Sequence, residues 1–180
     1  MRPLVLWLVG CMLPLAAAFG SLFPDSATVD GARFPKMGEH RTTYKVFFKL
    51  YDAALFAEAG ATANDVLARD CAFRIEFRYL RSIPKATILK SAHHMLRKNL
   101  SPEILDSIAQ PTERLHASFR SVERGDRSSL TYTPGDGTIF AINDQPLVTI
   151  PGKEFAEHYL QIWLGERPIS LELRDHLLAR

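Results

Sequence analysis

Hydrophobic and polar residues alternate most regularly over residues 73–79, where four apolar or aromatic side chains alternate with three charged ones. A period of two places successive side chains on opposite faces of a strand. We therefore predict a strand with one buried and one solvated face. A second run, from Tyr44 to Phe56, contains no glycine or proline and predicts one long, uninterrupted strand.

After Pro84 the hydrophobic period changes to nearly four, which is typical of an amphipathic helix. Its apolar positions are Ile88, Leu89, Ala92, Met95 and Leu96. Ser101 followed by Pro102 predicts the start of a second helix, which we expect Pro111 to interrupt. A third short helical segment is expected around residues 115–119.

Turn residues mark the remaining elements. The sequence PGDG at 134–137 lies between two apolar runs and predicts a hairpin, followed by a strand at 147–150. An apolar helix face over 155–163 is expected to end at Gly165 in a left-handed conformation, and Ser170 to cap a final helix. The order of strands, helices, strands and helices predicts an α+β fold, in which helices cover one face of an antiparallel sheet.

Residues 1–18 predict a cleaved export signal, because a basic start precedes fifteen uncharged residues that end in three alanines. Such a run is too short to span a bilayer but suits signal peptidase. A retained anchor and lipidation at Cys11 are the alternatives. Export implies a periplasmic or secreted protein without stable membrane insertion after cleavage. Residues 19–37 are expected to form an irregular lead-in, with one short strand near Val29, before a domain at 38–180.

Composition adds mainly exclusions. The 22 basic and 20 acidic residues leave a net charge of +2, which gives no electrostatic basis for a nucleic-acid partner. Two cysteines exclude a disulfide scaffold, and a chain of this length can bury a core without one. No nucleotide-binding loop, Ser-His-Asp order or metal-ligand spacing is present, so we expect no cofactor and no metal site.

Three stretches resemble the chalcone isomerase-like superfamily, especially its exported bacterial members. They are FFKLYDAALF at 47–56, the pair Gly125-Asp126 ahead of PGDGT at 134–138, and Phe155-Ala156 leading to IWLGERP at 162–168. The resemblance implies the family's open-faced β-sandwich, a long antiparallel sheet backed by helices. The family includes plant enzymes that close a flavanone ring, plastid proteins that hold a fatty acid, and bacterial proteins without established chemistry, so membership alone does not choose a function.

The plant enzymes hold their substrate with polar groups at positions that this chain fills differently. Matching the family pattern places Tyr51 at a strand threonine, Ala86 at a helix tyrosine, His93 at an asparagine and Ile162 at the threonine before the final Gly-Glu. Losing one preorganised donor of an oxyanion site typically costs about 100- to 1,000-fold in rate. The resemblance therefore implies no efficient chalcone isomerisation and no catalytic residue at these positions.

In the fatty-acid-binding branch an arginine and a tyrosine grip the ligand carboxylate, and Arg41 and Tyr51 resemble that pair. On one uninterrupted strand they would lie about 33 Å apart, too far for a single carboxylate. The pair works only if the chain folds back, and no glycine or proline from Thr42 to Leu50 favours a turn. The alternative is that Arg41 is a surface charge and Tyr51 a ring at the edge of the core.

We therefore predict an exported protein that binds a small apolar ligand, such as a fatty acid, between the sheet and the helices without catalysing a reaction. Arg41, Tyr51, His93 and Ile162 are the candidate ligand-binding residues, and a carboxylate on the ligand is compatible with them. Two alternatives remain open. One is an isomerase or lyase with a site rearranged around the first three of these residues, and the other is a protein-interaction module without a pocket.

Overall fold

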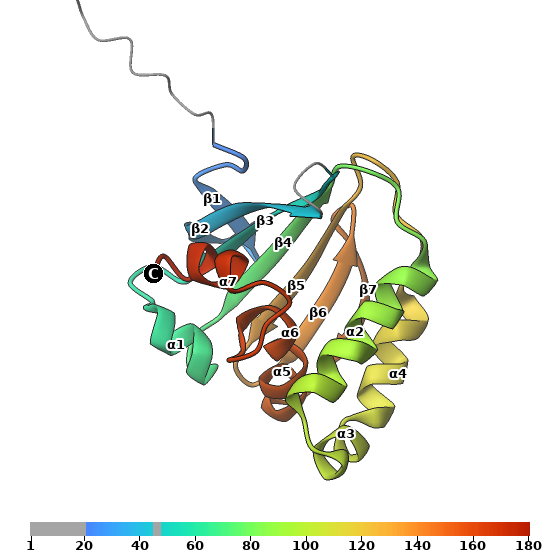
Figure 1. The fold of residues 1–180 in the computed structure, drawn as a ribbon. Coiled ribbons are helices and arrows are strands. Elements are labelled where there is room, and N and C mark those ends of the chain that lie inside the picture. The colour runs from blue at the N-terminus through green and yellow to red at the C-terminus, as the bar shows by residue number, and fades with distance from the viewer. Residues whose placement is uncertain (1–20, 45–47) are drawn as a thin grey trace, which may run out of the picture.

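Seven strands form one curled antiparallel sheet in which each strand pairs with its neighbours along the chain, from β1 to β7 (Figure 1). This computed structural model describes residues 21–44 and 48–180. The strands are β1 Ser26–Val29, β2 Ala32–Tyr44, β3 Phe48–Ala57, β4 Phe73–Tyr79, β5 Arg127–Thr133, β6 Gly137–Ile142 and β7 Gln145–Ile150. The predicted strand at 73–79 is β4, at the centre of the sheet.

The helices pack on one face of this sheet, as Figure 1 shows. They are α1 Ala63–Ala68, α2 Lys85–Asn99, α3 Pro102–Ser107, α4 Ala109–Ser118, α5 Lys153–Tyr159, α6 Gln161–Leu164 and α7 Leu171–Leu177. Helix α7 lies on β2 and β3, α4 lies against β7, and α2 packs on α6. The predicted α+β fold with helices on one face is thus confirmed. None of the helices within the described ranges has the length and apolar character that crossing a membrane requires.

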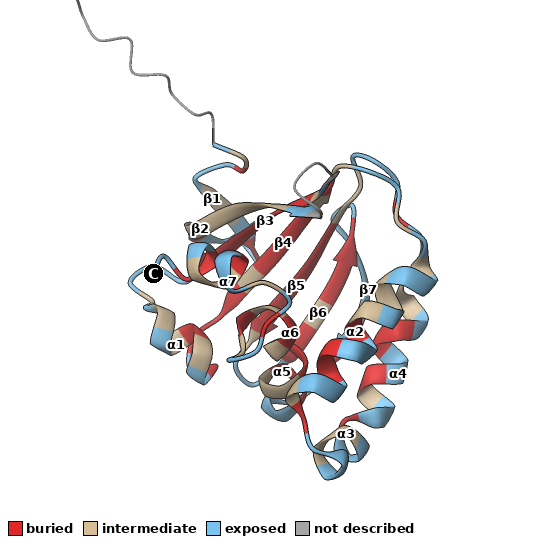
Figure 2. Ribbon diagram, viewed as in Figure 1, coloured by how far each residue is buried: buried red, intermediate tan, exposed pale blue. Residues whose placement is uncertain are grey.

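The main core lies between the sheet and the helices, and Figure 2 shows the buried residues along the central strands. Leu55 and Ile75 from the sheet and Leu115 and Leu173 from the helices are fully buried there. The four side chains come from strands and helices that are far apart in sequence. We call the face of the sheet that the helices cover the inner face, and the opposite face the outer face. Alternation along each strand directs successive side chains to one face and then the other.

The long strand predicted from Tyr44 to Phe56 is wrong at its start. Strand β2 ends at Tyr44 and β3 begins at Phe48, and the two pair antiparallel, so the chain reverses direction between them. The connecting residues 45–47 lie outside the described ranges. Alternation has the same period on both arms of a hairpin, so the sequence pattern continues without a visible break where the direction changes.

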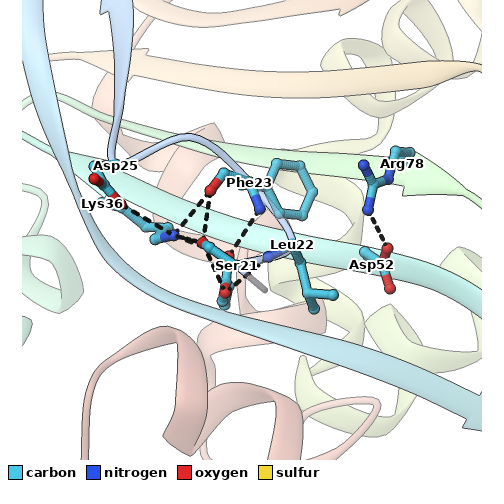
Figure 3. Close-up of polar contacts among 8 residues, drawn as sticks. Ser21, Leu22, Phe23, Asp25, Lys36, Asp52 and Arg78 are labelled. Atoms are coloured by element: carbon cyan, nitrogen blue, oxygen red, sulfur yellow. Dashed lines mark hydrogen bonds and ion pairs between the residues drawn. The ribbon is translucent and has the colours of Figure 1, made fainter. Parts of the chain in front are cut away.

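The irregular lead-in expected at 19–37 is also wrong over most of its length, because β1 and the first part of β2 occupy it. The expected short strand near Val29 is β1. The carboxylate of Glu39 accepts hydrogen bonds from the backbone N–H groups of Leu22 and Phe23, both at 3.0 Å. Figure 3 shows the polar contacts around Ser21, Phe23 and Lys36. These contacts hold the segment against the sheet.

Apolar residues of the same N-terminal segment explain why it packs. Phe23, Val29 and Phe34 form a second, smaller buried cluster with three residues on the outer face of the sheet, Ala54, Phe56 and Ala72. The Phe23 and Phe56 rings meet edge to face, with 6.3 Å between their centroids. Three widely spaced apolar residues are too few to show a period in the sequence, so their packing was missed.

Two predicted helix boundaries need correction. Pro111 does not interrupt a helix but lies in the first turn of α4, where a missing N–H leaves no intrahelical hydrogen bond unmade. The break falls earlier, at Ile108. Gly165 ends α6 with a φ of −74°, so it is not left-handed. A Cβ at this glycine would instead lie 2.8 Å from the backbone oxygen of Gln161. The predicted cap at Ser170 is confirmed, since its side chain accepts from the N–H of Leu173.

Candidate functional site

A cavity of about 330 Å³ lies between the inner face of the sheet and the helices. Its volume is near the lower end of the range of about 300–1,000 Å³ for small-molecule sites. Most of its wall is apolar or aromatic and comes from the sheet, from α2 and from the α5–α6 region. The lining residues include Tyr51, Tyr79, Arg81, Ser82, Thr87, Ser91, Ala92, Ser128, Leu130, Phe140, Tyr159, Ile162 and Trp163.

The cavity has a buried apolar end and an exposed polar end. Leu130, Phe140 and Ile162 are each 2% exposed. In contrast, Arg81 and Ser82, at the start of the segment that leads to α2, are solvent-exposed. Arg81 is the one charged residue among the described residues that line the cavity. A ligand with an apolar chain and a polar end group therefore fits in one orientation, with the chain inside.

Two tyrosines from neighbouring strands place phenols on the cavity wall. The Tyr79 hydroxyl lies 3.0 Å from the hydroxyl of Ser128 in a buried hydrogen bond. Tyr51 packs edge to face on Tyr79 and on Phe77. Burial raises the pKa of Tyr51 to about 12, although the neighbouring side chains of Thr42 and Trp163 act in the other direction. Both phenols are therefore neutral at pH 7 and can donate hydrogen bonds.

A chain of hydrogen bonds connects the cavity wall to the surface. The hydroxyl of Tyr159 lies 3.0 Å from Nε2 of His116, and Nδ1 of His116 lies 2.9 Å from Nε2 of His93. Tyr159 and His116 are buried, whereas His93 is exposed. Burial, the charge of His93 and the charge of Lys85 lower the pKa of His116 to about 4. His116 is therefore a neutral imidazole at pH 7 that can exchange hydrogen bonds on both sides.

Arg41 and Tyr51 are neighbours in the sheet but lie on opposite faces. Tyr51 pairs with Thr42, and the adjacent pair is Arg41 with Asp52. Successive residues of a strand point to opposite faces, so Arg41 is directed to the outer face while Tyr51 lines the inner cavity. The Arg41 guanidinium binds the buried Asp52 carboxylate, with Nε at 2.6 Å from Oδ1. The fold-back that the pair required is present, yet it brings only the two backbones together.

The positions matched to the plant enzymes lie in different places relative to the cavity. Ile162 lines the cavity and is buried. Ala86 and His93 lie on the exposed side of α2, and His93 reaches the cavity only through His116 and Tyr159. The α2 residues that do line the cavity include Thr87 and Ser91. The ungapped match counted from Pro84 therefore selected the wrong side of this helix.

Several lining residues were missed by the sequence reading, and two of them had a usable signal. Tyr79 continues the alternation of the buried face of β4, so a cavity-facing phenol was readable from parity alone. Ser91 lies within the apolar stripe of α2, where a polar residue is unexpected. Arg81 and Ser128 carry no such signal, because only tertiary packing brings them to the cavity. The same holds for His116, which packing brings to Tyr159.

A second hollow adjoins the first. The two share five lining residues, which are Leu50, Tyr51, Thr87, Ser91 and Ile169. The second hollow extends under α7 to His40, Thr42 and Glu172. Its wall is more polar in composition, since it carries several hydroxyl side chains and ionisable groups. The apolar cavity is thus continuous, through the five shared residues, with a more polar hollow.

The family model described as chalcone isomerase-like matches residues 16–179. The chain belongs to the chalcone isomerase-like family. No curated protein matches its sequence. The match begins well before residue 38, so the segment expected as a separate lead-in lies within the region shared by chalcone isomerase-like proteins, in agreement with β1 and β2.

Among solved structures, a fatty-acid binding protein of Arabidopsis thaliana has a similar fold. The two superpose with a TM-score of 0.64 at 17% sequence identity, over 87% of this chain and 90% of the plant protein. At that identity the likeness establishes the fold. It confirms that this member of the chalcone isomerase-like family has the sheet-and-helix architecture inferred from the sequence.

Proposed function

We propose that the protein binds one fatty acid, or a similar amphiphile with one apolar chain, in the inner-face cavity without catalysing a reaction. The observation that carries this proposal is the gradient along the cavity, from fully buried apolar residues to an exposed end with a single arginine. An apolar pocket with a few polar anchors is the usual form of a small-molecule site. The fold shared with a plant fatty-acid binding protein supports the same class of ligand.

The carboxylate of the ligand would lie at the exposed end, beside Arg81. A guanidinium forms charge-assisted hydrogen bonds with a carboxylate, and Ser82 and Tyr51 line the same cavity with hydroxyl groups. The chain would extend toward Leu130 and Phe140. This assigns the cation to Arg81, which lines the cavity, rather than to Arg41, which is directed to the outer face of the sheet.

Titration of the delipidated chain with a C16 fatty acid tests this arrangement. Arg81→Ala removes the cation at the open end, and we expect affinity to fall about tenfold, the value of one charge-assisted hydrogen bond of about 1.5 kcal/mol. Arg124→Ala removes another exposed arginine, one that does not line the cavity, and should leave affinity unchanged. Equal affinities for the wild type and Arg81→Ala would contradict the proposed orientation, and no binding by the wild type would contradict the proposed function.

One observation favours catalysis as a second candidate. The Tyr159 hydroxyl on the cavity wall is hydrogen-bonded to the neutral imidazole of His116, an arrangement that can move a proton to or from a bound molecule. A chalcone turnover assay with the wild type and Tyr159→Phe separates the two functions. We expect the wild type to show no rate above the uncatalysed reaction, and a rate that disappears in Tyr159→Phe would favour the isomerase.

We also propose that the chain is exported and acts in the periplasm or outside the cell. The support is the sequence of residues 1–18, with its basic start, uncharged run and terminal alanines. Intact-mass measurement of the chain recovered from the expressing cell tests this directly. A mass that corresponds to cleavage after Ala18, or one or two residues later, is expected. A full-length mass would contradict cleavage, and a mass that includes a lipid on Cys11 would support the lipidated alternative.

A further inference from the structure

Two histidines and a glutamate that are separated in sequence come together where β2 passes under α7. His40 lies on β2, and Glu172 and His176 lie on α7. Each offers one nitrogen or oxygen ligand atom, and these three atoms lie within 4.8 Å of one another. The rings of His40 and His176 have their centroids 4.7 Å apart. No metal-ligand spacing is visible in the sequence because one of the three residues, His40, lies on a strand 132 residues before Glu172.

The fold fixes the distance between the two elements at this point. Gly38 faces α7, and a Cβ on it would lie 1.9 Å from the backbone oxygen of His176. The strand and the helix therefore touch through their backbones, which places His40, two residues further along the same face, beside His176. On α7, Glu172 and His176 are four residues apart and so share one side of the helix.

The hydrogen bond of His176 prepares its ring to bind a metal. Its Nδ1 lies 2.8 Å from the backbone carbonyl oxygen of Glu172. A carbonyl oxygen only accepts, so Nδ1 carries the proton and, in the neutral ring, Nε2 has the free lone pair. Metal-binding histidines commonly donate their second ring N–H to a carbonyl or carboxylate in this way, which fixes the tautomer and the ring orientation.

We infer that His40, Glu172 and His176 form a binding site for a divalent transition-metal ion of the Zn²⁺ type. Two imidazoles and one carboxylate are a ligand set that Zn²⁺ accepts, whereas Mg²⁺ and Ca²⁺ prefer oxygen ligands alone. Bonds of about 2.0–2.1 Å in a tetrahedron place the ligand atoms about 3.4 Å apart. Glu172 is exposed, so rotation of its side chain can bring a carboxylate oxygen to that spacing.

Three protein ligands leave a fourth position of a tetrahedral ion open. His40 and Glu172 both line the second hollow, together with Thr42, Thr43 and Ser170, so the open position adjoins this polar depression. A water molecule or an external anion can occupy it. None of the three ligands lines the apolar cavity, so the site does not depend on the proposed fatty-acid binding.

Competition for Zn²⁺ against a chromophoric chelator tests the site, using untagged full-length chain that has been freed of metal. We expect one equivalent of Zn²⁺ per chain, and at least about tenfold weaker binding in each of His40→Ala, His176→Ala and Glu172→Gln. His94→Ala is the matched control, because His94 is an exposed histidine on α2 outside the group. Circular dichroism of each variant verifies that the fold is retained.

The titration separates the outcomes clearly. No Zn²⁺ binding by the wild type, or equal affinity in the wild type and the two histidine variants, would overturn the site. A loss in His94→Ala as large as in His40→Ala would show nonspecific surface binding and would also overturn it. Loss in both histidine variants without any loss in Glu172→Gln would overturn the three-ligand assignment. Glu172→Gln keeps the size of the side chain, so its result does not depend on a packing defect.

Discussion

The two faces of the sheet are built from alternate residues of the same strands and differ in chemistry. On the inner face, Tyr51, Phe77 and Tyr79 line an apolar cavity under the helices. On the outer face, the intervening residues form ion pairs. The Asp52 carboxylate is fully buried and binds Arg41 and Arg78, at 2.6 and 2.7 Å. The two faces therefore have different roles. Ligand binding is proposed for the inner face, whereas ion pairs on the outer face connect neighbouring strands.

The outer face carries a second buried carboxylate, on the next strand. The carboxylate of Glu76, which is 2% exposed, lies between Arg74 and Arg127. Each buried carboxylate thus binds two arginines: Asp52 connects β3 to both β2 and β4, whereas Glu76 connects β4 to β5 and contacts Arg74 on its own strand. Burial alone raises the pKa of Asp52, but hydrogen bonds from Arg41 and Arg78 outweigh it and hold that pKa below its usual value. Arg41 therefore stabilises the sheet through its ion pair with Asp52 on the outer face. It is a poor candidate for binding a ligand in the inner cavity.

The largest expected effect on stability comes from the contact between the inner face and α7. Gly38→Ala would place a Cβ 1.9 Å from the backbone oxygen of His176 and 2.8 Å from that of Leu177. Because both neighbours are backbone atoms of α7, rotation of a side chain cannot relieve the overlap. We expect a loss of about 3 kcal/mol or more in the free energy of unfolding. Urea denaturation measures it. A loss below about 1 kcal/mol would show that α7 is not held as closely to β2 as the structure indicates.

On the outer face, Asp52→Asn removes the charge that two arginines share while it keeps the size of the side chain. We expect a loss of about 2–3 kcal/mol, the range for hydrogen bonds to charged groups, reduced because both arginines are partly exposed. Asp144→Asn is the control, since that carboxylate pairs with Arg74 but is 69% exposed, and it should change stability by less than about 0.5 kcal/mol. Equal effects of the two variants would contradict the distinction between buried and exposed ion pairs.

On the helical side of the core, His116 of α4 is expected to have a smaller, pH-dependent effect on the free energy of unfolding. Its pKa in the folded state is about 4, below the usual 6.5, so between these values the unfolded chain binds more protons and stability falls as pH falls. From pH 7 to 5 the expected loss is about 2 kcal/mol. His116→Gln should remove this loss, while His94→Ala should retain it. Parallel stability curves for the wild type and His116→Gln would show that His116 is not buried as a neutral ring.

Much of the fold was readable from the sequence because its signals are local. The alternation of β4 and the period of α2 each fix a buried face without reference to the rest of the chain. The hairpin of β2 and β3 was missed for the opposite reason, since its two arms repeat one alternation and carry no glycine or proline between Thr42 and Leu50. That one error separated Arg41 from its true partner, Asp52.

The candidate site was only partly readable, because its residues meet through tertiary packing. Tyr51 and Ile162 were predicted and line the cavity. Arg81 was not, since an arginine after a strand has no local pattern that distinguishes it from a surface charge. The partners of His116 and His40 come from helices distant in sequence. Parity indicates the face on which a residue lies, whereas the identity of its neighbour across a core depends on the whole fold.

Native mass spectrometry of the chain purified under mild conditions tests the central claim, that the inner-face cavity holds an apolar chain, most directly. The account predicts a fraction of the wild type carrying an added mass equal to a fatty acid. In Ala92→Phe, which fills the cavity from α2, the protein should remain folded and carry no such mass. A ligand-free wild type that also fails to take up added fatty acid would contradict the claim, and so would equal loading of the wild type and Ala92→Phe.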